Sequence, residues 1–153
     1  MFNWKLGRRT ASTFLTKKEE KAVIEAIREA ERKTSGEIRV HMETECPYGL
    51  MDRAADIFME LKMHETDLRN GVLFYFAIKD HQFSVIGDVG IHTLVGDQFW
   101  VEEVELIESY FENDQFKEGL VAGIKRVGIK LREHFPYQDD DINELPDEIS
   151  YGD

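Results

Sequence analysis

Residues 72–78 form an uninterrupted apolar run, Val-Leu-Phe-Tyr-Phe-Ala-Ile, near the middle of the chain. A short run of this kind, rich in aromatic and β-branched residues and bounded by glycine and polar residues, is typical of a β-strand. Successive side chains of a strand point to opposite faces, so a strand that is apolar throughout needs apolar cover on both faces. The run therefore predicts a central strand in a sheet that lies between two layers of helices.

The neighbouring segments predict the rest of this sheet. Residues 37–44 alternate between apolar and polar side chains, which predicts a strand with one face more polar than the other. Residues 83–86 follow the central strand after a tight connection, so these two strands should form an antiparallel hairpin. The strand at 37–44 should lie parallel to the central strand, because a helix at about 50–62 connects them as a right-handed crossover. The glycine-rich residues 87–90 are expected to form a short strand or a loop.

Apolar positions at spacings of three and four residues predict four helices. They are expected at about residues 16–35, 50–62, 97–111 and 114–134. Thr16-Lys17-Lys18-Glu19 matches a capping box, and Gly36 is expected to end the first helix in a left-handed conformation. Asp97 is expected to cap the third helix, with Val101 on its buried face. The predicted fold is a single three-layer α/β sandwich, with a mixed sheet of approximately four strands, one antiparallel hairpin and helices on both faces.

Length and charge limit the domain organisation and the ligands of the chain. Its 153 residues suit one domain. We expect a flexible basic segment at residues 1–13, an α/β domain at residues 14–137 and an acidic tail at residues 138–153. The net charge of −12 comprises +5 from residues 1–18, −7 from the tail and −10 from the residues between them. This acidity disfavours nucleic acid as a partner and suits a cation or an unknown protein partner of basic character.

The sequence also bears on membrane association. No segment approaches the roughly 18 consecutive apolar residues of a membrane span. The first residues lack the apolar core of a secretion signal. We therefore expect a cytoplasmic protein with no transmembrane segment and no peripheral membrane contact.

Familiar nucleotide-binding and nucleophile motifs are missing. The sequence contains no Gly-x-x-x-x-Gly-Lys-Ser/Thr loop, no Gly-x-Gly-x-x-Gly fingerprint and no Gly-x-Ser-x-Gly elbow. The single cysteine, Cys46, excludes an intrachain disulfide and a metal site of several thiolates. Cys46 and Arg53 are one residue further apart than in the Cys-x5-Arg loop of cysteine phosphatases, so a small, semi-buried thiol is the better interpretation.

The predicted topology brings polar residues from three segments to one edge of the sheet. Asp67, Asp88 and Asp97 are the candidate metal ligands there, because carboxylates beside a glycine-bent backbone suit calcium or magnesium. No organic cofactor is expected. In the alternative, structural interpretation, Asp88 shapes a turn and Asp97 only caps a helix.

The same edge carries three candidate ligand-binding residues, Glu37, Arg69 and Asn70. Arg69 can hold a phosphate or a carboxylate through two parallel hydrogen bonds. In the structural interpretation, Arg69 pairs with an acid and Asn70 shapes a turn.

The opposite edge of the sheet is a competing site. It carries Glu45, Cys46, Asp80 and His81. Ligands of open α/β sheets often bind beyond the carboxyl ends of the strands, which favours this second edge. The sequence leaves the choice between the two edges open.

Several short motifs, in this order and spacing, resemble a known family. They are Phe14-Leu15-Thr16, Thr34-Ser35-Gly36-Glu37-Ile38-Arg39-Val40, Thr66-x-x-Arg69-Asn70-Gly71-Val72-Leu73, Ile86-Gly87-Asp88-x-Gly90-Ile91, Phe116-x-x-Gly119-Leu120, and residues 143–149 after His134-Phe135-Pro136. Over about residues 14–149 the chain resembles the TPM domain, named for a thylakoid-lumen phosphatase-like protein, a photosystem II repair protein and a receptor modulator. The tail motif is similar to that of a bacterial soluble subgroup.

The resemblance implies a mixed sheet sandwiched by helices, and it leaves the biochemistry open. Some relatives are acid phosphatases, some bind calcium, and others act as assembly or repair factors. Our first hypothesis is a non-enzymatic binding or assembly module with a divalent cation, calcium or magnesium, at the Asp88 edge. The alternative is a metal-assisted phosphomonoester phosphatase in which carboxylates hold the cation and Arg69 orients the phosphoryl group.

Overall fold

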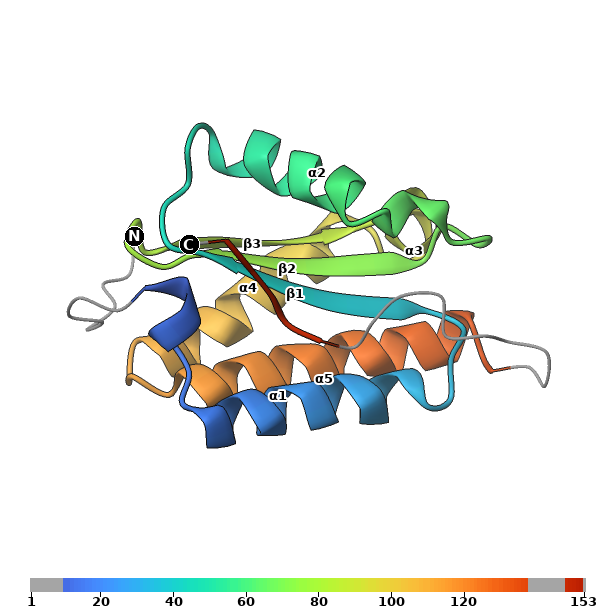
Figure 1. The fold of residues 1–153 in the computed structure, drawn as a ribbon. Coiled ribbons are helices and arrows are strands. Elements are labelled where there is room, and N and C mark those ends of the chain that lie inside the picture. Colours follow the sequence, from blue (N-terminus) through green and yellow to red (C-terminus); the bar gives the residue numbers. More distant parts are fainter. Residues whose placement is uncertain (1–9, 138–147, 153) are drawn as a thin grey trace.

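A four-stranded mixed sheet forms the middle layer of the computed structural model, which describes residues 10–137 and 148–152 (Figure 1). In order across the sheet, the strands are β3 (Gln82–Gly87), β2 (Gly71–Ala77), β1 (Glu37–Glu43) and β4 (Ser150–Gly152). β2 is parallel to β1 and antiparallel to β3, and β4 lies parallel to the outer edge of β1. The predicted α/β class, mixed sheet and antiparallel hairpin are confirmed.

Helices cover both faces of this sheet (Figure 1). One face packs against α1 (Lys17–Glu31), α4 (Asp97–Phe111) and α5 (Phe116–His134). The other face packs against α2 (Leu50–Glu60) and the short 3₁₀ helix η2 (Met63–Glu65). A second 3₁₀ helix, η1 (Ala11–Thr13), precedes α1, and α3 (Val89–Val95) follows β3. None of the helices in the described ranges combines the length and the apolar character that a membrane span needs.

The apolar central run is divided between two cores, as predicted. Val72, Phe74 and Phe76 of β2 face α1, α4 and α5 in the larger core. Leu73 and Tyr75 face α2 in the smaller core. Every residue of β2 is buried, which is why the strand can be apolar at each position.

Local sequence explains the start of α1 but not its end. Glu19 donates its backbone N–H to Thr16 Oγ1 at 3.1 Å, and Thr16 donates its own to Glu19 Oε1 at 2.9 Å, so the capping box is confirmed. The expectation for Gly36 was wrong: α1 ends at Glu31, and Gly36 does not have a positive φ. Instead, a Cβ at this position would lie 2.7 Å from Leu131 Cδ2, so glycine allows close packing against α5.

Two features of α4 also differ from prediction. Gly96, with φ of 78°, stands at the N-cap, and Asp97 is the first helical residue and makes no capping bond. Val101 is exposed, and the buried face of α4 carries Phe99 and Glu103 instead. The remaining apolar positions of the pattern do face the core, since Ile107 and Phe111 are buried and Trp100 and Val104 pack against the larger core.

The sequence did not predict two short elements. α3 occupies part of the segment expected to be a short strand or a loop, and Asp88 caps it by accepting a hydrogen bond from Val89 N at 2.7 Å. β4 lies within the segment predicted to be an acidic tail, and Ile149 beside it is buried in the larger core. Residues 1–9, 138–147 and 153 of the two predicted terminal segments lie outside the described residues.

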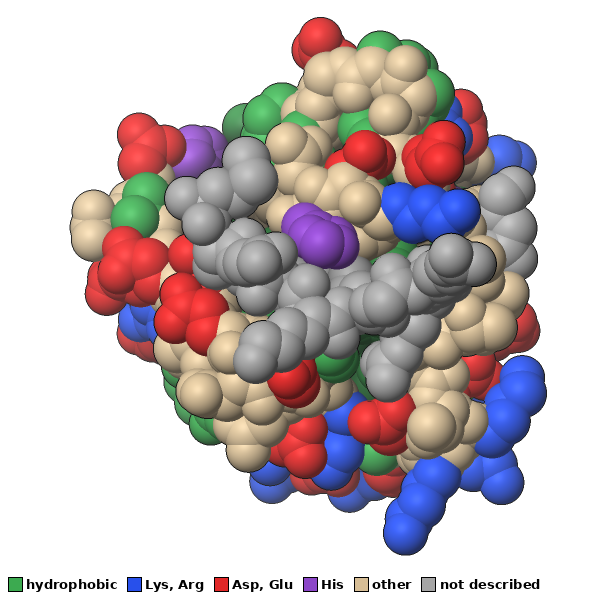
Figure 2. All heavy atoms as spheres, turned by 90° about the vertical axis from the view of Figure 1, so that its left-hand side faces the viewer, with side chains coloured by type: hydrophobic (Ala, Val, Ile, Leu, Met, Phe, Trp, Pro, Cys, Tyr) green, Lys and Arg blue, Asp and Glu red, His purple; other side chains and the backbone are tan. Residues whose placement is uncertain are grey.

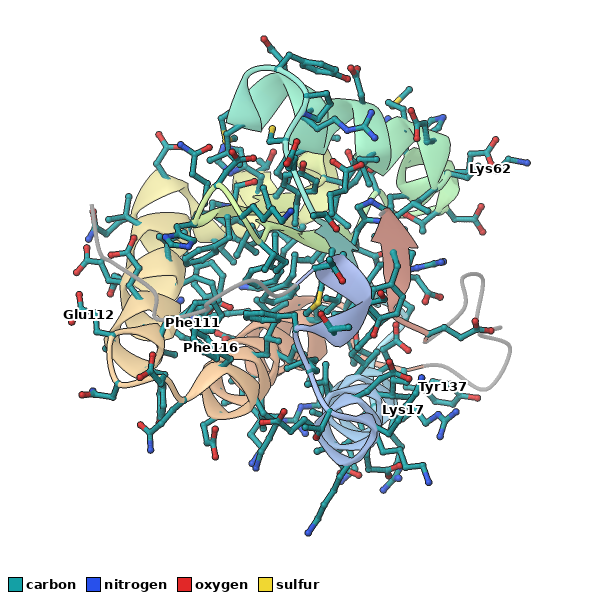
Figure 3. The ribbon with its side chains drawn as sticks, turned by 60° about the vertical axis from the view of Figure 1, so that its left-hand side comes forward. Lys17, Lys62, Phe111, Glu112, Phe116 and Tyr137 are labelled. Carbon is teal, nitrogen blue, oxygen red and sulfur yellow. The ribbon has the colours of Figure 1, made fainter. Side chains whose placement is uncertain are left out.

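The turn between α4 and α5 is closed by aromatic packing. Phe111 at the end of α4 and Phe116 at the start of α5 lie close together, with ring centroids 5.1 Å apart in an edge-on arrangement (Figure 3). A Cβ on Gly119 would lie 2.9 Å from the Phe111 ring, so this glycine permits the close approach.

Candidate functional site

The amino ends of β1 and β2 and the end of β3 meet at one edge of the sheet, which we call the Asp88 edge. Arg69 Nε donates to Asp88 Oδ2 at 2.7 Å and Arg69 Nη2 donates to Asp88 Oδ1 at 2.9 Å. The Asp88 side chain is 7% exposed and the Arg69 side chain 49% exposed. The hydrogen bonds that Arg69 donates to Asp88 are the main reason why the pKa of Arg69 is raised. The predicted pairing of Arg69 with an acid is present in the structure.

The backbone around this ion pair is tightly folded. Gly90 donates its N–H to Arg69 O at 2.8 Å, and Asp88 donates its own to Gly71 O at 2.9 Å. A Cβ on Gly90 would lie 2.1 Å from Leu68 O, so only glycine fits. Arg69 has φ of 52°, in the left-handed region that is unfavourable for a residue with a Cβ. The edge is therefore a close contact between two backbone turns, fastened by the Arg69–Asp88 pair.

Asn70 and Glu37 lie at the same edge. Glu37 donates its backbone N–H to Asn70 O at 3.4 Å. The Asn70 side chain is buried, and its Nδ2 donates to Ser35 Oγ at 3.3 Å. Among the described residues, Asn70 Oδ1 has no hydrogen-bond partner. This oxygen is of the kind that calcium accepts as a ligand.

The other two predicted metal ligands are more exposed. Asp67 lies on the loop that leads to Arg69 and is exposed. The Asp97 side chain is 96% exposed, and its Oδ1 lies 3.3 Å from His92 Nε2. In the sequence, Asp88 precedes α3 and Asp97 follows it. The structure thus brings Glu37, Arg69, Asn70 and Asp88 to one edge by direct bonds, and it shows no bond from Asp67 or Asp97 to that group.

A metal ion would find few side-chain ligands already assembled. Within residues 10–137 and 148–152, no three His, Cys, Asp or Glu side chains lie close enough together to hold a metal ion. Calcium also accepts amide and backbone oxygens and water, so Asp88, Asp67 and Asn70 Oδ1 suit a weak, water-rich site better than a closed carboxylate cage.

The carboxyl end of β1 carries a second polar cluster, around Glu43. Arg53 of α2 donates Nε to both Glu43 oxygens, at 3.1 and 3.0 Å, and donates Nη2 to Oε1. Tyr75 of β2 donates its hydroxyl to Glu43 Oε2 at 2.5 Å. Burial acts to raise the pKa of Glu43, but the bonds from Arg53 and Tyr75 outweigh it and leave the pKa below its usual value. Glu43 is therefore an ionised, buried centre that joins β1, β2 and α2.

His41 extends this cluster to β4. Its Nε2 lies 3.4 Å from Glu43 Oε1, and its Nδ1 lies 2.7 Å from Ser150 Oγ. Burial lowers the pKa of His41 more than the neighbouring carboxylate raises it. The Ser150 hydroxyl has one proton and donates it to Val40 O at 3.3 Å, so it accepts from His41 Nδ1–H, and the neutral ring carries its proton on Nδ1.

The competing residues predicted from sequence surround this second cluster. Asp80 accepts a hydrogen bond from Cys46 N, Cys46 Sγ donates to Tyr48 O at 2.9 Å, and His81 sits in the hairpin turn with φ of 53°. An open hollow of about 580 Å³ lies beside them, lined in part by Glu43, Glu45 and Cys46. Figure 2 shows the molecule from this end, where acidic, basic and histidine side chains lie together in the middle of the face.

Sequence analysis found the polar face of β1 but not the Glu43 cluster. The alternation of residues 37–44 already placed His41 and Glu43 on one face. The sequence did not single out Arg53 as the partner of Glu43, because Arg53 is one of several charged residues on α2. Only the path of the crossover places its side chain over Glu43. Ser150 could not be placed, because it lies 109 residues from His41 in the chain.

The fold and its two polar edges define a class: a single α/β domain with a mixed four-stranded sheet between helices. The TPM domain matches residues 9–129, and the chain belongs to the TPM domain family. The match confirms the resemblance found in the sequence. A comparison with curated proteins finds no match.

Solved structures agree with this assignment. The chain is similar to the BA42 protein from the psychrophilic bacterium Bizionia argentinensis, with 50% identity over 91% of this chain and 96% of that one and a TM-score of 0.85. It shares its fold with the N-terminal domain of a P. gingivalis protein, at 17% identity over 88% and 85% of the two chains and a TM-score of 0.68. It also shares its fold with the N-terminal domain of the cg2496 protein from Corynebacterium glutamicum, at 10% identity over 76% and 74% and a TM-score of 0.61.

Proposed function

We propose that this TPM domain is a non-enzymatic binding or assembly module that binds a divalent cation, calcium in preference to magnesium, at the Asp88 edge. The observation that carries the proposal is that Arg69 forms an ion pair with Asp88. Two of its donors already engage Asp88, so the arginine that a phosphatase would use to orient a phosphoryl group is paired with the carboxylate that would hold the metal. This arrangement favours a structural or binding edge over a hydrolytic centre.

The proposed cation shares Asp88 with Arg69. Each carboxylate oxygen has two lone pairs, and Asp88 Oδ2 accepts only the Arg69 Nε bond among the described hydrogen bonds. Because about half of the Arg69 side chain is exposed, it can move aside as an ion approaches. Asp67 on the preceding loop and the Asn70 oxygen are the further ligands that we assign, with water completing the shell.

A calcium titration followed by NMR tests this proposal. We expect millimolar calcium to shift the amide signals of residues 66–71 and 87–90, and Asp88→Asn to abolish the shifts. Arg69→Gln should tighten binding several-fold, because it removes a positive charge beside the ion. Asp52→Asn, which removes an exposed carboxylate on α2, is the matched control and should bind like the wild type. Unchanged signals near Asp67, Asp88 and Asp97 would remove the cation from the proposal.

A generic phosphomonoester assay separates the module from the phosphatase alternative. We expect no turnover with calcium or magnesium present. Turnover that is lost in both Asp88→Ala and Arg69→Ala would show that the domain is an enzyme and would overturn the non-enzymatic part of the proposal.

The acidic charge of −10 between the terminal segments supports a basic protein as the partner of such a module. The cytoplasmic location expected from the sequence belongs to the same proposal. Pull-down at low and high salt tests the partner: a protein captured through this acidic surface should be released as the salt concentration rises.

A further inference from the structure

The outer edge of β1 is occupied by a very short strand. In the part of the chain that the structure describes, β4 pairs with three of the seven residues of β1, in the register His41 with Ser150, Met42 with Tyr151 and Glu43 with Gly152. Beyond the strand pairing, Thr44 donates its N–H to Gly152 O at 2.9 Å. Strands of globular proteins usually have five or six residues, so β4 makes few backbone bonds for its position in the sheet.

Side chains therefore contribute much of what holds β4, and they alternate between the two faces of the sheet. Ser150 faces the α2 side, where its hydroxyl lies 2.7 Å from His41 Nδ1. Tyr151 faces the opposite side, where it packs against the larger core and donates its hydroxyl to Glu20 Oε2 of α1. Ile149 is buried in the same core. The edge of β1 thus places a hydroxyl beside His41 at position 150 and an aromatic ring against the larger core at position 151.

The last position accepts glycine alone. A Cβ on Gly152 would lie 2.9 Å from Glu43 Cγ and 3.1 Å from Glu43 Oε1. A flexible glutamate could move away, but Glu43 is fixed by Arg53 and Tyr75. The buried cluster at the carboxyl end of β1 therefore leaves no room for a side chain at this end of the edge.

We propose that the outer edge of β1 is a peptide-binding site, and that β4 is an intramolecular occupant which a partner protein can replace. The partner supplies an extended segment with the pattern aliphatic, Ser, aromatic, Gly, which adds parallel to β1. Main-chain hydrogen bonds provide affinity in this mode of binding, and the positions for alternate side chains provide specificity. This inference uses neither the cation nor Asp88, so it stands or falls separately from the proposed function.

The chain's own strand has an advantage that the partner must overcome. A segment of the same chain competes with a free peptide because its binding is intramolecular. An edge strand of three residues also belongs to the parts of a protein that open at low free-energy cost. An isolated peptide should therefore bind weakly to the wild type and much better to a variant whose own strand is excluded.

The full-length Gly152→Val variant supplies such a receptor, because the added side chain cannot fit against Glu43. The probe is a synthetic peptide of residues 147–153, titrated into ¹⁵N-labelled protein. We expect it to shift the amide signals of His41, Met42 and Thr44 in Gly152→Val, with at least 10-fold weaker binding to the wild type. A peptide with valine in place of its glycine should not bind. Gly49→Ala, at an open glycine whose Cβ would meet nothing closer than 3.5 Å, is the matched control and should behave as the wild type.

Three outcomes would overturn the inference. The first is a folded Gly152→Val variant that does not bind the peptide, and the second is equal binding of a scrambled peptide. The third is a wild-type protein that forms dimers by exchanging β4 strands, which would make a second copy of the chain the occupant. If Gly152→Val does not fold, Tyr151→Ser serves as the receptor, because it removes the contact with Glu20 without adding bulk.

Discussion

Arg69 and Asp88 face each other as a two-pronged ion pair, with Nε–Oδ2 at 2.7 Å and Nη2–Oδ1 at 2.9 Å. The pair joins the loop before β2 to the residue that caps α3. It forms with Arg69 in a left-handed backbone conformation, with φ of 52°. The backbone strain and the ion pair at this position can be separated by mutation.

Replacing Arg69 by glycine and by alanine separates these two contributions. Both variants lose the guanidinium, so any difference between them comes from the backbone. Because alanine retains the cost of a Cβ at φ of 52°, Arg69→Gly should melt a few degrees higher than Arg69→Ala. Thermal unfolding followed by circular dichroism measures the difference. Equal melting temperatures would mean that the left-handed conformation carries no cost here.

Gly90 should be among the least replaceable residues of the Asp88 edge. In Gly90→Ala, the new Cβ would lie 2.1 Å from Leu68 O and 2.5 Å from Arg69 O, and both atoms are backbone. We expect a loss of about 2–3 kcal/mol in the free energy of unfolding, measured with urea. Gly49→Ala is the control: its Cβ meets nothing closer than 3.5 Å, so it should lose no more than the roughly 0.5–1 kcal/mol of an N-cap change at the start of α2. A tolerated Gly90→Ala would show that the two turns can separate.

The fold was predictable where its determinants are local. The apolar run of β2 and the alternation of β1 follow from side-chain direction in a strand, which depends only on neighbouring residues. α3 was missed because it has seven residues and begins beside Gly90, which resembles a turn signal in the sequence. β4 was missed because its pairing with β1 spans more than a hundred residues, and nothing in an acidic segment indicates it.

The site was predictable only in part, for a related reason. Topology alone placed Arg69, Asn70 and Asp88 at one edge, since it depends on strand order. The Glu43 cluster depends on how α2 lies over β1, so the bond between Arg53 and Glu43 could not be read from spacing. Glu103 was missed because a charged residue on the buried face of a helix contradicts the pattern that identifies that face.

The stability of the domain should decrease in mild acid because of His41. The folded state holds the pKa of His41 below its ordinary value of 6.5, so below pH 6.5 the unfolded chain binds more protons than the folded one. Glu43, Arg53 and Arg39 face this ring, and Glu43 alone acts to raise its pKa. The loss should therefore begin near pH 6.5 and grow as the pH falls.

His41→Gln tests this assignment, since glutamine does not titrate. The decrease in melting temperature between pH 7 and pH 5, measured by calorimetry, should be smaller in the variant than in the wild type. Glu43 reduces the stability further only below its ordinary pKa of 4.5, because the folded state holds the pKa of Glu43 below that value. An identical decrease in both proteins above pH 5 would rule out His41 as the source.

Glu103 should make the domain less stable as the pH rises, which is the opposite dependence. Its side chain is buried between α4 and α5, where Oε1 lies 3.3 Å from Arg126 Nη1 and Oε2 has no hydrogen-bond partner among the described residues. Burial raises the pKa of Glu103 to about 8, although Arg126 acts in the other direction. The folded state therefore keeps a proton that the unfolded chain releases above pH 4.5, and stability should fall between pH 4.5 and about pH 8.

Glu103→Gln keeps the shape of the side chain and removes its titration. At pH 5 the variant and the wild type should have similar stability, because Glu103 is protonated in the fold. At pH 8 the variant should be more stable by about 2–4 kcal/mol, measured by urea unfolding. Glu105→Gln, at an exposed position of the same helix, is the matched control and should show no such growth with pH. If the stability difference between Glu103→Gln and the wild type is the same at pH 5 and at pH 8, Glu103 is already ionised in the fold. Arg126 would then compensate its charge fully.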